Sequence, residues 1–173
     1  MLDEPEKLAR FEQNILAHLD AAYNLARWLC GNDSDASDLV QDACLRAFKF
    51  FDRFRGGSGR AWLLRIVRNG FYDRLKQDRR APEPFDEALH DLADEGSAPD
   101  ALLAQKADQE LVGQALAELP VEFREILILR ELEGMSYREI AEVADLPLGT
   151  VMSRLARGRQ QLRARLVKRM ELK

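Results

Sequence analysis

A helix-turn-helix pattern in residues 134–169 constrains the fold of this chain more than any other feature of its sequence. Ser136 and Glu139 stand three residues apart ahead of apolar positions, which is the spacing of a capping box that opens a short amphipathic helix. The four residues after Ala144, Asp-Leu-Pro-Leu, have room only for a tight turn, and Gly149 then opens a second helix. The apolar positions of that second helix recur on one face: Val151, Leu155, Leu162 and Leu166.

The second helix of this pattern is strongly basic. Residues 151–169 contain seven Lys or Arg side chains and no Asp or Glu. A helix of this kind is suited to the phosphates that flank a major groove, where the second helix of a helix-turn-helix lies. The sequence therefore indicates DNA as the ligand of this part of the chain.

The charges of the chain are arranged in blocks. Residues 53–80 contain nine basic side chains against two acidic ones, whereas residues 82–110 contain nine acidic side chains against one lysine. The net charge of -4 over 173 residues therefore does not argue against nucleic acid, because binding depends on how the charge is distributed. The order along the chain is a basic block, an acidic segment and the basic second helix.

The periodicity of the sequence predicts an all-α fold. Every segment with a readable period is helical, and no stretch alternates as a strand does. The acidic segment is poor in large apolar residues and contains prolines, as a linker does. We expect two small helical domains at residues 1–80 and 106–173, joined by a flexible acidic linker at residues 81–105, with the second domain ending in the helix-turn-helix.

Three helices are expected in the first domain. An apolar stripe from Leu8 to Leu29 predicts one helix that ends before Gly31. Ser34 or Asp35 can cap a second helix. The inner positions of this second helix are expected to be Leu39, Ala43, Ala47, Phe50 and Phe51. A third helix is expected at residues 60–80, with an inner line of Trp62, Ile66, Gly70 and Leu75.

No metal, cofactor or membrane segment is expected. Cys30 and Cys44 stand among apolar neighbours, which favours buried free thiols over a disulfide. With His18 they would supply three metal ligands and no fourth. No apolar run approaches the roughly 18 residues of a membrane helix, and the acidic N-terminus has no signal-peptide pattern. The expected location is the cytoplasm.

Three stretches of the sequence follow one another in a distinctive order. Residues 35–48 read Asp-Ala-Ser-Asp-Leu-Val-Gln-Asp-Ala-Cys-Leu-Arg-Ala-Phe, and residues 60–69 read Arg-Ala-Trp-Leu-Leu-Arg-Ile-Val-Arg-Asn. Residues 119–166 contain the helix-turn-helix. Together they resemble the extracytoplasmic-function (group IV) sigma factors of the bacterial sigma-70 family. This resemblance covers most of the chain outside the acidic segment.

The resemblance implies a polymerase-binding surface on the helix that includes residues 35–51. In similar factors this helix binds a coiled coil of the polymerase β′ subunit, and the matching candidates here are Asp38, Gln41 and Asp42. Solvated polar side chains on an outer helix face explain the same residues equally well.

The basic block resembles the part that melts the -10 promoter element and holds its non-template strand. Single strands are bound by basic grooves, stacking aromatic rings and pockets for extruded bases. The loop that caps a flipped base in similar factors matches Arg55, Gly56, Gly57 and Ser58. Asn69 matches a base-reading residue, and Arg65 and Arg68 match phosphate contacts. Trp62 is expected to pack in the core, while Phe71 and Tyr72 remain undecided between packing and DNA contact.

The N-terminal half of the last helix resembles the part that reads the -35 element. The matching positions are Thr150, Ser153, Arg154 and Arg157. Arg159, Arg163 and Arg165 are expected to contact phosphates or solvent. Met152 and Ala156 depart from the residues that many relatives have there, so the sequence preference is expected to differ.

Taken together, these observations predict a sigma factor that binds the β′ and β subunits of core RNA polymerase and promoter DNA, and that catalyses nothing itself. The resemblance also implies an anti-sigma factor as a partner. The alternative is a helix-turn-helix transcriptional regulator with an N-terminal dimerisation or sensor domain, but such a domain does not need the basic block. A nucleic-acid enzyme lacks support, because no cluster of His, Cys or carboxylates has suitable spacing.

Overall fold

A computed structural model describes residues 3–78 and 99–172 of the chain, and the side chains of the second range from residue 106 onward. Every regular element in these ranges is helical, which confirms the all-α prediction. No helix in the described ranges is long and apolar enough to cross a membrane. The elements of the N-terminal half are α1 (Glu4–Asn14), η1 (Leu16–His18), α2 (Leu19–Cys30), α3 (Asp33–Lys49), η2 (Phe51–Arg53) and α4 (Gly59–Asp78). Those of the C-terminal half are α5 (Pro99–Glu118), α6 (Val121–Leu127), the π-helical η4 (Ile128–Leu132), α7 (Tyr137–Ala144) and α8 (Leu148–Glu171).

The first predicted helix is wrong as a single element, because the chain turns through η1 between α1 and α2. Ile15 at this turn is completely buried, whereas Leu8 and Leu19 are 47% and 37% exposed. The turn redirects α1 so that the ring of Phe11 meets the ring of Phe48, with 5.2 Å between the ring centroids. Burial of Ile15 and Phe11 therefore favours the turn over the single continuous helix that the apolar pattern predicted.

The start of α3 also differs from the prediction. The N-cap is Asn32, whose Oδ1 accepts a hydrogen bond from the backbone N–H of Asp35 at 2.8 Å. The preceding residue, Gly31, adopts a left-handed conformation with φ of 82° and ends α2. At the other end Phe51 is buried as expected, but Phe50 is 37% exposed because α3 ends at Lys49.

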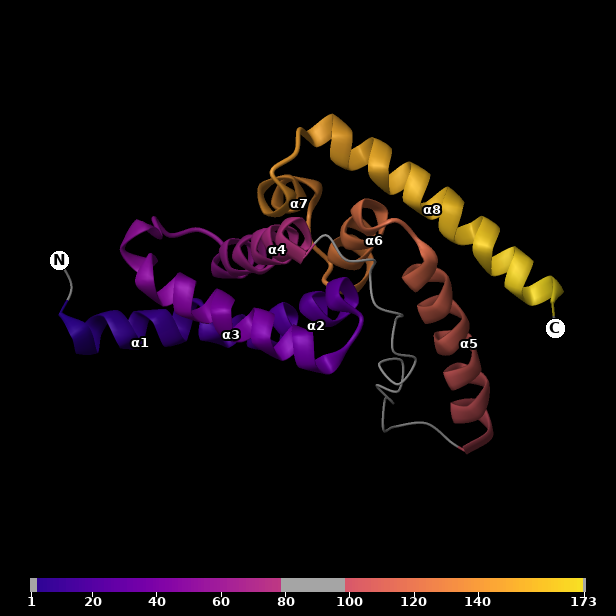
Figure 1. Cartoon of the computed structure of the whole chain (residues 1–173), viewed down its shortest axis with the longest axis horizontal. Coiled ribbons are helices and arrows are strands. Elements are labelled where there is room, and N and C mark those ends of the chain that lie inside the picture. The colour runs from indigo at the N-terminus through magenta and orange to yellow at the C-terminus, as the bar shows by residue number, and fades with distance from the viewer. Residues whose placement is uncertain (1–2, 79–98, 173) are drawn as a thin grey trace.

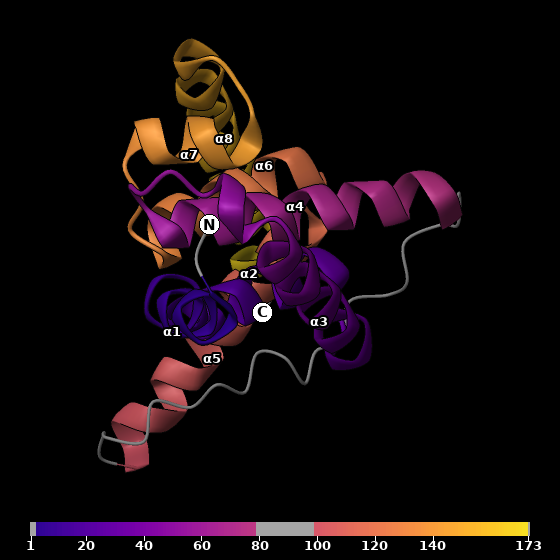
Figure 2. The ribbon, with the colours of Figure 1, turned by 90° about the vertical axis from the view of Figure 1, so that its left-hand side faces the viewer.

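Helix α4 forms the centre of the molecule. Its predicted inner line is right only in part. Trp62 and Ile66 are partly buried against the core, but Leu75 is 40% exposed. The buried positions are Gly59, Ala61, Leu63, Leu64 and Val67. The reason is that α4 packs against α2 and α3 on one side and against α7 on the other, so two of its faces are covered (Figure 1). The perpendicular view also places α4 between the N-terminal helices and α7 (Figure 2).

The C-terminal half is organised around α8. Helices α5, α6 and α7 all pack against it. The close contact with α6 occurs at Gly158, where an added Cβ would lie 3.3 Å from side-chain carbons of Leu127. Helix α5 begins at Pro99, within the predicted linker of residues 81–105, and residues 81–98 of that linker lie outside the described part of the chain.

The two halves of the chain pack against each other. Helix α2 contacts α6, and α4 contacts α7. Their buried apolar side chains belong to one cluster that includes Leu63 of α4 and Ile140 of α7. The two halves therefore share a core in this arrangement, which brings together the segments that the sequence resemblance assigned to two promoter elements.

Candidate nucleic-acid interface

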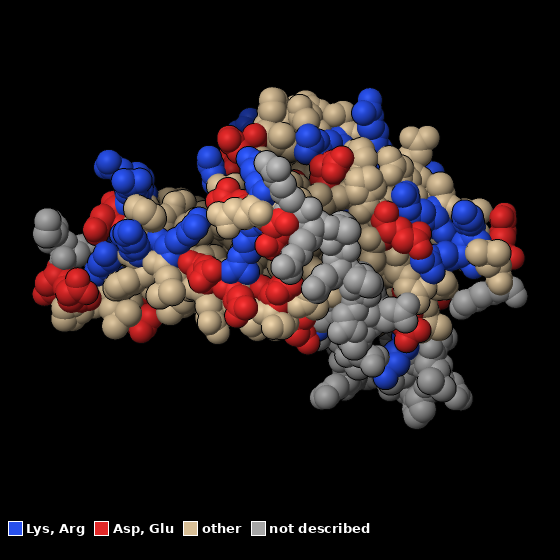
Figure 3. Space-filling view, viewed as in Figure 1, with Lys and Arg blue, Asp and Glu red and all other residues tan. Residues whose placement is uncertain are grey.

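The acidic face of α3 is exposed. Asp38, Gln41 and Asp42 all lie on the outside of the helix, opposite the buried Leu39 and Ala43. Acidic side chains gather over α3 on the face of the molecule shown in Figure 3. Since Asp42 also forms an ion pair with Arg74 of α4, Asp38 and Gln41 are the more accessible members of this set.

The loop before α4 combines glycine geometry with a helix cap. Gly56 and Gly57 adopt φ of +89° and +81°, a region that residues with a Cβ rarely adopt. Arg55 and both glycines are exposed. The hydroxyl of Ser58 accepts a hydrogen bond from the backbone N–H of Ala61 at 3.0 Å and so caps α4. The loop is held in place by this cap while its tip faces solvent.

The aromatic side chains around this loop pack on one another. The ring of Trp62 lies 5.3 Å from the ring of Phe54 and 6.4 Å from that of Phe51, measured between centroids. Trp62 is partly buried and packs against the core, as expected from the sequence. Its role here is to anchor the start of α4 beneath the loop.

The arginines of α4 meet acidic groups of the C-terminal half. Arg68 donates to Glu125 of α6 through Nε to Oε2 at 3.1 Å and Nη2 to Oε1 at 3.3 Å. Arg65 is more exposed, and its Nη2 lies 3.9 Å from Oδ1 of Asp145. Asn69 is exposed, and its Oδ1 accepts a long contact from Arg68 at 3.5 Å.

Glu125 is a carboxylate buried at the contact between α4 and α6. Its exposed fraction is 0%, and it is the only buried charged side chain in the part of the chain whose side chains are described. Burial raises its pKa, while hydrogen bonds from Arg68 and Tyr72 act in the opposite direction. Burial would lower the pKa of Arg68, but its bonds with Glu125 raise it. The contacts with Arg68 and Tyr72 therefore offset only part of the effect of burial, and the pKa of Glu125 stays above its usual value.

Tyr72, which the sequence left undecided, belongs to this cluster. Its hydroxyl donates to Oε1 of Glu125 at 3.1 Å, and its ring lies 4.3 Å from the guanidinium carbon of Arg68. Burial and the charge of Glu125 raise the pKa of the Tyr72 hydroxyl, so it stays a donor. Phe71 packs edge-on against the Tyr72 ring, with 5.4 Å between centroids.

The helix-turn-helix has the predicted local geometry. The hydroxyl of Ser136 accepts from the N–H of Glu139 at 3.1 Å, and Oε1 of Glu139 accepts from the N–H of Ser136 at 3.2 Å, which confirms the capping box. Asp145 ends α7 with a left-handed φ of 54°, and Pro147 is the N-cap of α8. The turn therefore ends one residue earlier than expected.

The four candidate residues on α8 fall into two groups. Ser153 and Arg157 are exposed on the side opposite the buried Val151 and Leu155, together with Met152 and Ala156. Thr150 and Arg154 are half-buried on one flank. The charge of Arg154 also lowers the pKa of Glu125, which places this flank toward the cluster described above.

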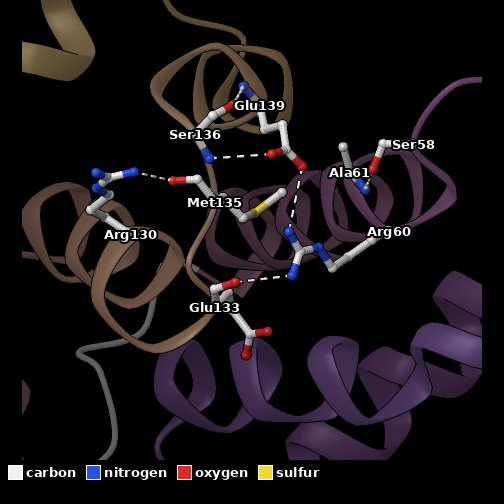
Figure 4. A network of polar contacts seen from close by, with 8 residues as sticks. All are labelled: Ser58, Arg60, Ala61, Arg130, Glu133, Met135, Ser136 and Glu139. Atoms are coloured by element: carbon white, nitrogen blue, oxygen red, sulfur yellow. Dashed lines mark hydrogen bonds and ion pairs between the residues drawn. The ribbon is translucent and has the colours of Figure 1, made fainter.

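No role is predicted from the sequence for Arg60, Glu125 or Glu133. The guanidinium of Arg60 donates to the backbone carbonyl of Glu133 at 2.9 Å and lies 3.5 Å from Oε2 of Glu139 (Figure 4). Asn24 of α2 donates to the carboxylate of Glu133 at 2.8 Å. One signal was present in the sequence: Glu125 directly precedes the four apolar residues 126–129, and an unpaired charge buried with them is expensive.

The cysteines do not form a reactive site. Cys30 and Cys44 are free and half-buried. Burial, together with the charge of Asp35, raises the pKa of the Cys30 thiol to about 12, so it stays protonated at neutral pH. In residues 3–78 and 106–172, no group of three or more His, Cys, Asp or Glu side chains is arranged to hold a metal ion.

Comparison with known proteins identifies relatives of both halves. The family models for Sigma-70 region 2 and Sigma-70, region 4 match residues 15–81 and 109–162. The chain is 36% identical over 163 residues to the ECF RNA polymerase sigma factor SigE of Mycolicibacterium smegmatis. The aligned region covers 91% of this chain and 62% of that relative's length. It is also 36% identical over 137 residues to the ECF RNA polymerase sigma-E factor of Escherichia coli, covering 74% and 72%.

Solved structures show the same similarity. One is the sigma factor RpoE in complex with the anti-sigma factor NepR from Bartonella quintana, with a TM-score of 0.71 and 30% identity over 92% of this chain and 97% of that chain. Another is CnrH in complex with the cytosolic domain of CnrY, with a TM-score of 0.65 and 29% identity over 91% and 88%. The similarity therefore extends across both halves.

Proposed function

Because this chain belongs to the extracytoplasmic-function sigma factors of the sigma-70 family, we propose that it binds core RNA polymerase and directs transcription from a specific set of promoters. It catalyses no reaction itself, and it acts in the cytoplasm, where the polymerase is. The single observation that supports this function best is the order of matches, with region 2 in residues 15–81 and region 4 in residues 109–162. A dimerising regulator has no need of a region 2 match.

The proposed polymerase contact is the exposed acidic face of α3. Asp38, Gln41 and Asp42 line it, and it is suited to a basic or polar helical surface such as a coiled coil of the β′ subunit. Exposed substitutions usually change stability by less than about 0.5 kcal/mol. Loss of binding in variants of this face would therefore report contact rather than unfolding.

The proposed promoter contacts lie at two places. The loop of Arg55, Gly56, Gly57 and Ser58, followed by Arg65, Arg68 and Asn69 of α4, binds the non-template strand of the -10 element. On α8, the exposed Ser153 and Arg157 are positioned for base edges of the -35 element, while Thr150 and Arg154 on the flank contact its backbone.

An anti-sigma factor is the proposed regulator. Two relatives of known structure were solved in complexes, RpoE with the anti-sigma factor NepR and CnrH with the cytosolic domain of CnrY. Since both are similar to this chain over more than nine-tenths of its length, a partner of the same class is expected to bind here.

Transcription in vitro tests the proposed function. Purified chain is mixed with core RNA polymerase on a randomised promoter library, and the transcribed templates are sequenced. Enrichment of two short motifs separated by a constant spacing is expected. Asp38→Lys should weaken co-purification with the polymerase, whereas the control Glu12→Lys, a charge reversal at another exposed position, on α1, should not. Equal polymerase binding by both variants would contradict the α3 contact.

A further inference from the structure

Helix α8 carries an apolar strip on its exposed side. Leu148, Met152 and Ala156 stand four residues apart, and α8 lies on the outside of the molecule (Figure 1). Leu148 and Met152 are 42% and 51% exposed, and Ala156 is exposed as well. Because residues four apart on a helix lie one above the other, the three side chains form one strip that faces solvent.

The surroundings of this strip are positively charged. Residues 151–169 of α8 contain seven basic side chains and no acidic one, and Arg157 is exposed next to Ala156. A surface of this charge favours a polyanion, and a helix in a major groove presents the side between its phosphate contacts to the base edges. The occupant that fits the strip is therefore duplex DNA, with the strip facing the floor of the groove.

Two polar side chains beside the strip have their donors engaged within the protein. The hydroxyl of Ser153 donates to the backbone carbonyl of Thr150 at 3.1 Å, in the first turn of α8. The guanidinium of Arg159 donates to Oε1 of Glu131 through Nε at 3.0 Å and Nη2 at 2.8 Å. Recognition along the strip therefore depends on contact with apolar groups more than on hydrogen bonds that it donates.

The apolar group that a major groove presents is the C5-methyl group of thymine. Each base pair shows a distinct pattern there, and among the four bases thymine alone adds a methyl group. Met152 is long and flexible enough to follow such a group. Met152 and Ala156 are about 6 Å apart along the helix axis, whereas stacked base pairs are about 3.4 Å apart, so the two side chains address A·T pairs about two steps apart.

We infer that Met152 and Ala156 select thymine in the -35 element through contact with its methyl group. The inference rests on the proposed function, because that function places the N-terminal half of α8 in the groove of this element. It adds a second kind of specificity to the same face of the helix. Ser153 and Arg157 recognise polar base edges, whereas the strip recognises methyl groups.

Selection of duplexes followed by removal of single methyl groups tests the inference. The full chain selects from a library of duplexes with randomised positions, and no polymerase is needed because the strip is exposed in the free chain. In the selected duplex each thymine is then replaced by deoxyuridine, which keeps the hydrogen-bonding edges and lacks the methyl group. Fluorescence anisotropy gives the dissociation constant of each duplex for the wild type, Met152→Ala and Val167→Ala. Val167 is the matched control, because it is 50% exposed on the same helix, about four turns further on.

Deoxyuridine at the contacted position should weaken binding by the wild type about fourfold, the effect of one methyl group lost from an apolar contact. Met152→Ala should bind the thymine and deoxyuridine duplexes alike at one position, and Ala156→Gly should do so at a second. Val167→Ala should keep the wild-type difference at both. Circular dichroism checks that the helices remain.

Three results would each overturn the inference. The selection enriches no thymine, deoxyuridine has no effect on binding by the wild type, or Met152→Ala keeps the full effect of deoxyuridine at every position. Because these measurements use no polymerase, failure of the transcription assay is a separate result and concerns the proposed function.

Discussion

Arg68 and Glu125 form a two-point ion pair across the two halves of the chain, with distances of 3.1 and 3.3 Å between their donor and acceptor atoms. The carboxylate has no exposed surface, and Tyr72 gives it a third hydrogen bond. A carboxylate in this position is tolerated because all three hydrogen bonds, two from Arg68 and one from Tyr72, are present. If one of them is lost, the charge has to be solvated, and separation of the halves is the available route.

Replacement of Arg68 should therefore affect the contact between the halves before it affects either half. Breaking a buried pair costs about 3–5 kcal/mol when the remaining charge stays buried. In Arg68→Met we expect a smaller loss, because Glu125 reaches water when the halves separate. Urea unfolding followed by circular dichroism should change from one transition to two.

The double variant Arg68→Met with Glu125→Leu provides the control. A buried pair replaced by apolar groups of similar volume is often neutral or stabilising, so the double variant should recover a single transition. If the double variant is as unstable as the sum of the two single variants, the two residues are not coupled in the way the contact requires.

Gly59 should tolerate no side chain. An added Cβ at this position would lie 1.9 Å from the backbone oxygen of Asn14, at the end of α1. The backbone has to move, and we expect Gly59→Ala to lower the free energy of unfolding by about 1–3 kcal/mol. Gly149→Ala is the matched control, because nothing lies within 4 Å of its added Cβ and alanine favours the helix. Chemical unfolding of both variants measures the difference, and equal stability would contradict the close contact.

Features set by neighbouring residues were predictable from the sequence. The capping box of Ser136 and Glu139 depends on two positions three residues apart, and it formed as expected. The burial of Val151 and Leu155 on α8 follows from a single helical period. These elements needed no knowledge of the rest of the chain.

The contact between the halves was not predictable in this way. Arg68 and Glu125 are 57 residues apart in the sequence, and Arg60 and Glu133 are 73 apart. A pattern along one helix gives the position of one apolar face, but α4 is covered on two sides. The predicted inner line therefore failed at Leu75, which is exposed.

The two ends of the exposed α8 face should differ in what they recognise. Arg157→Ala is expected to cost about 1–3 kcal/mol and to relax the preference at one promoter position. Arg163→Ala should weaken binding to all sequences alike and lower the salt slope by about 0.9, as the loss of one phosphate contact does. Titrations at several salt concentrations on several duplexes measure both effects. Identical behaviour of the two variants would contradict a base-reading end on α8.

The stability of the chain should depend on pH in opposite ways through two glutamates. Burial raises the pKa of Glu125, so the folded chain binds this proton more tightly than the unfolded chain. Its contribution to stability should increase as the pH falls from neutral through this raised pKa, and level off below about 4.3, the value of an unfolded glutamate.

Glu139 should behave in the reverse manner. Its slight burial acts to raise its pKa, but hydrogen bonds from Ser136 and the charge of Arg60 outweigh this and lower it. Its contribution is then present above about pH 4.3 and is lost as the pH falls through the lowered pKa.

The measurement is urea unfolding of the wild type, Glu125→Gln and Glu139→Gln at a series of pH values. The free energy of unfolding of the wild type minus that of Glu125→Gln should rise on acidification from pH 7. The corresponding difference for Glu139→Gln should decrease as the pH falls below about 4.3. If both differences fall together on acidification, Glu125 does not occupy the buried, proton-favouring position described here.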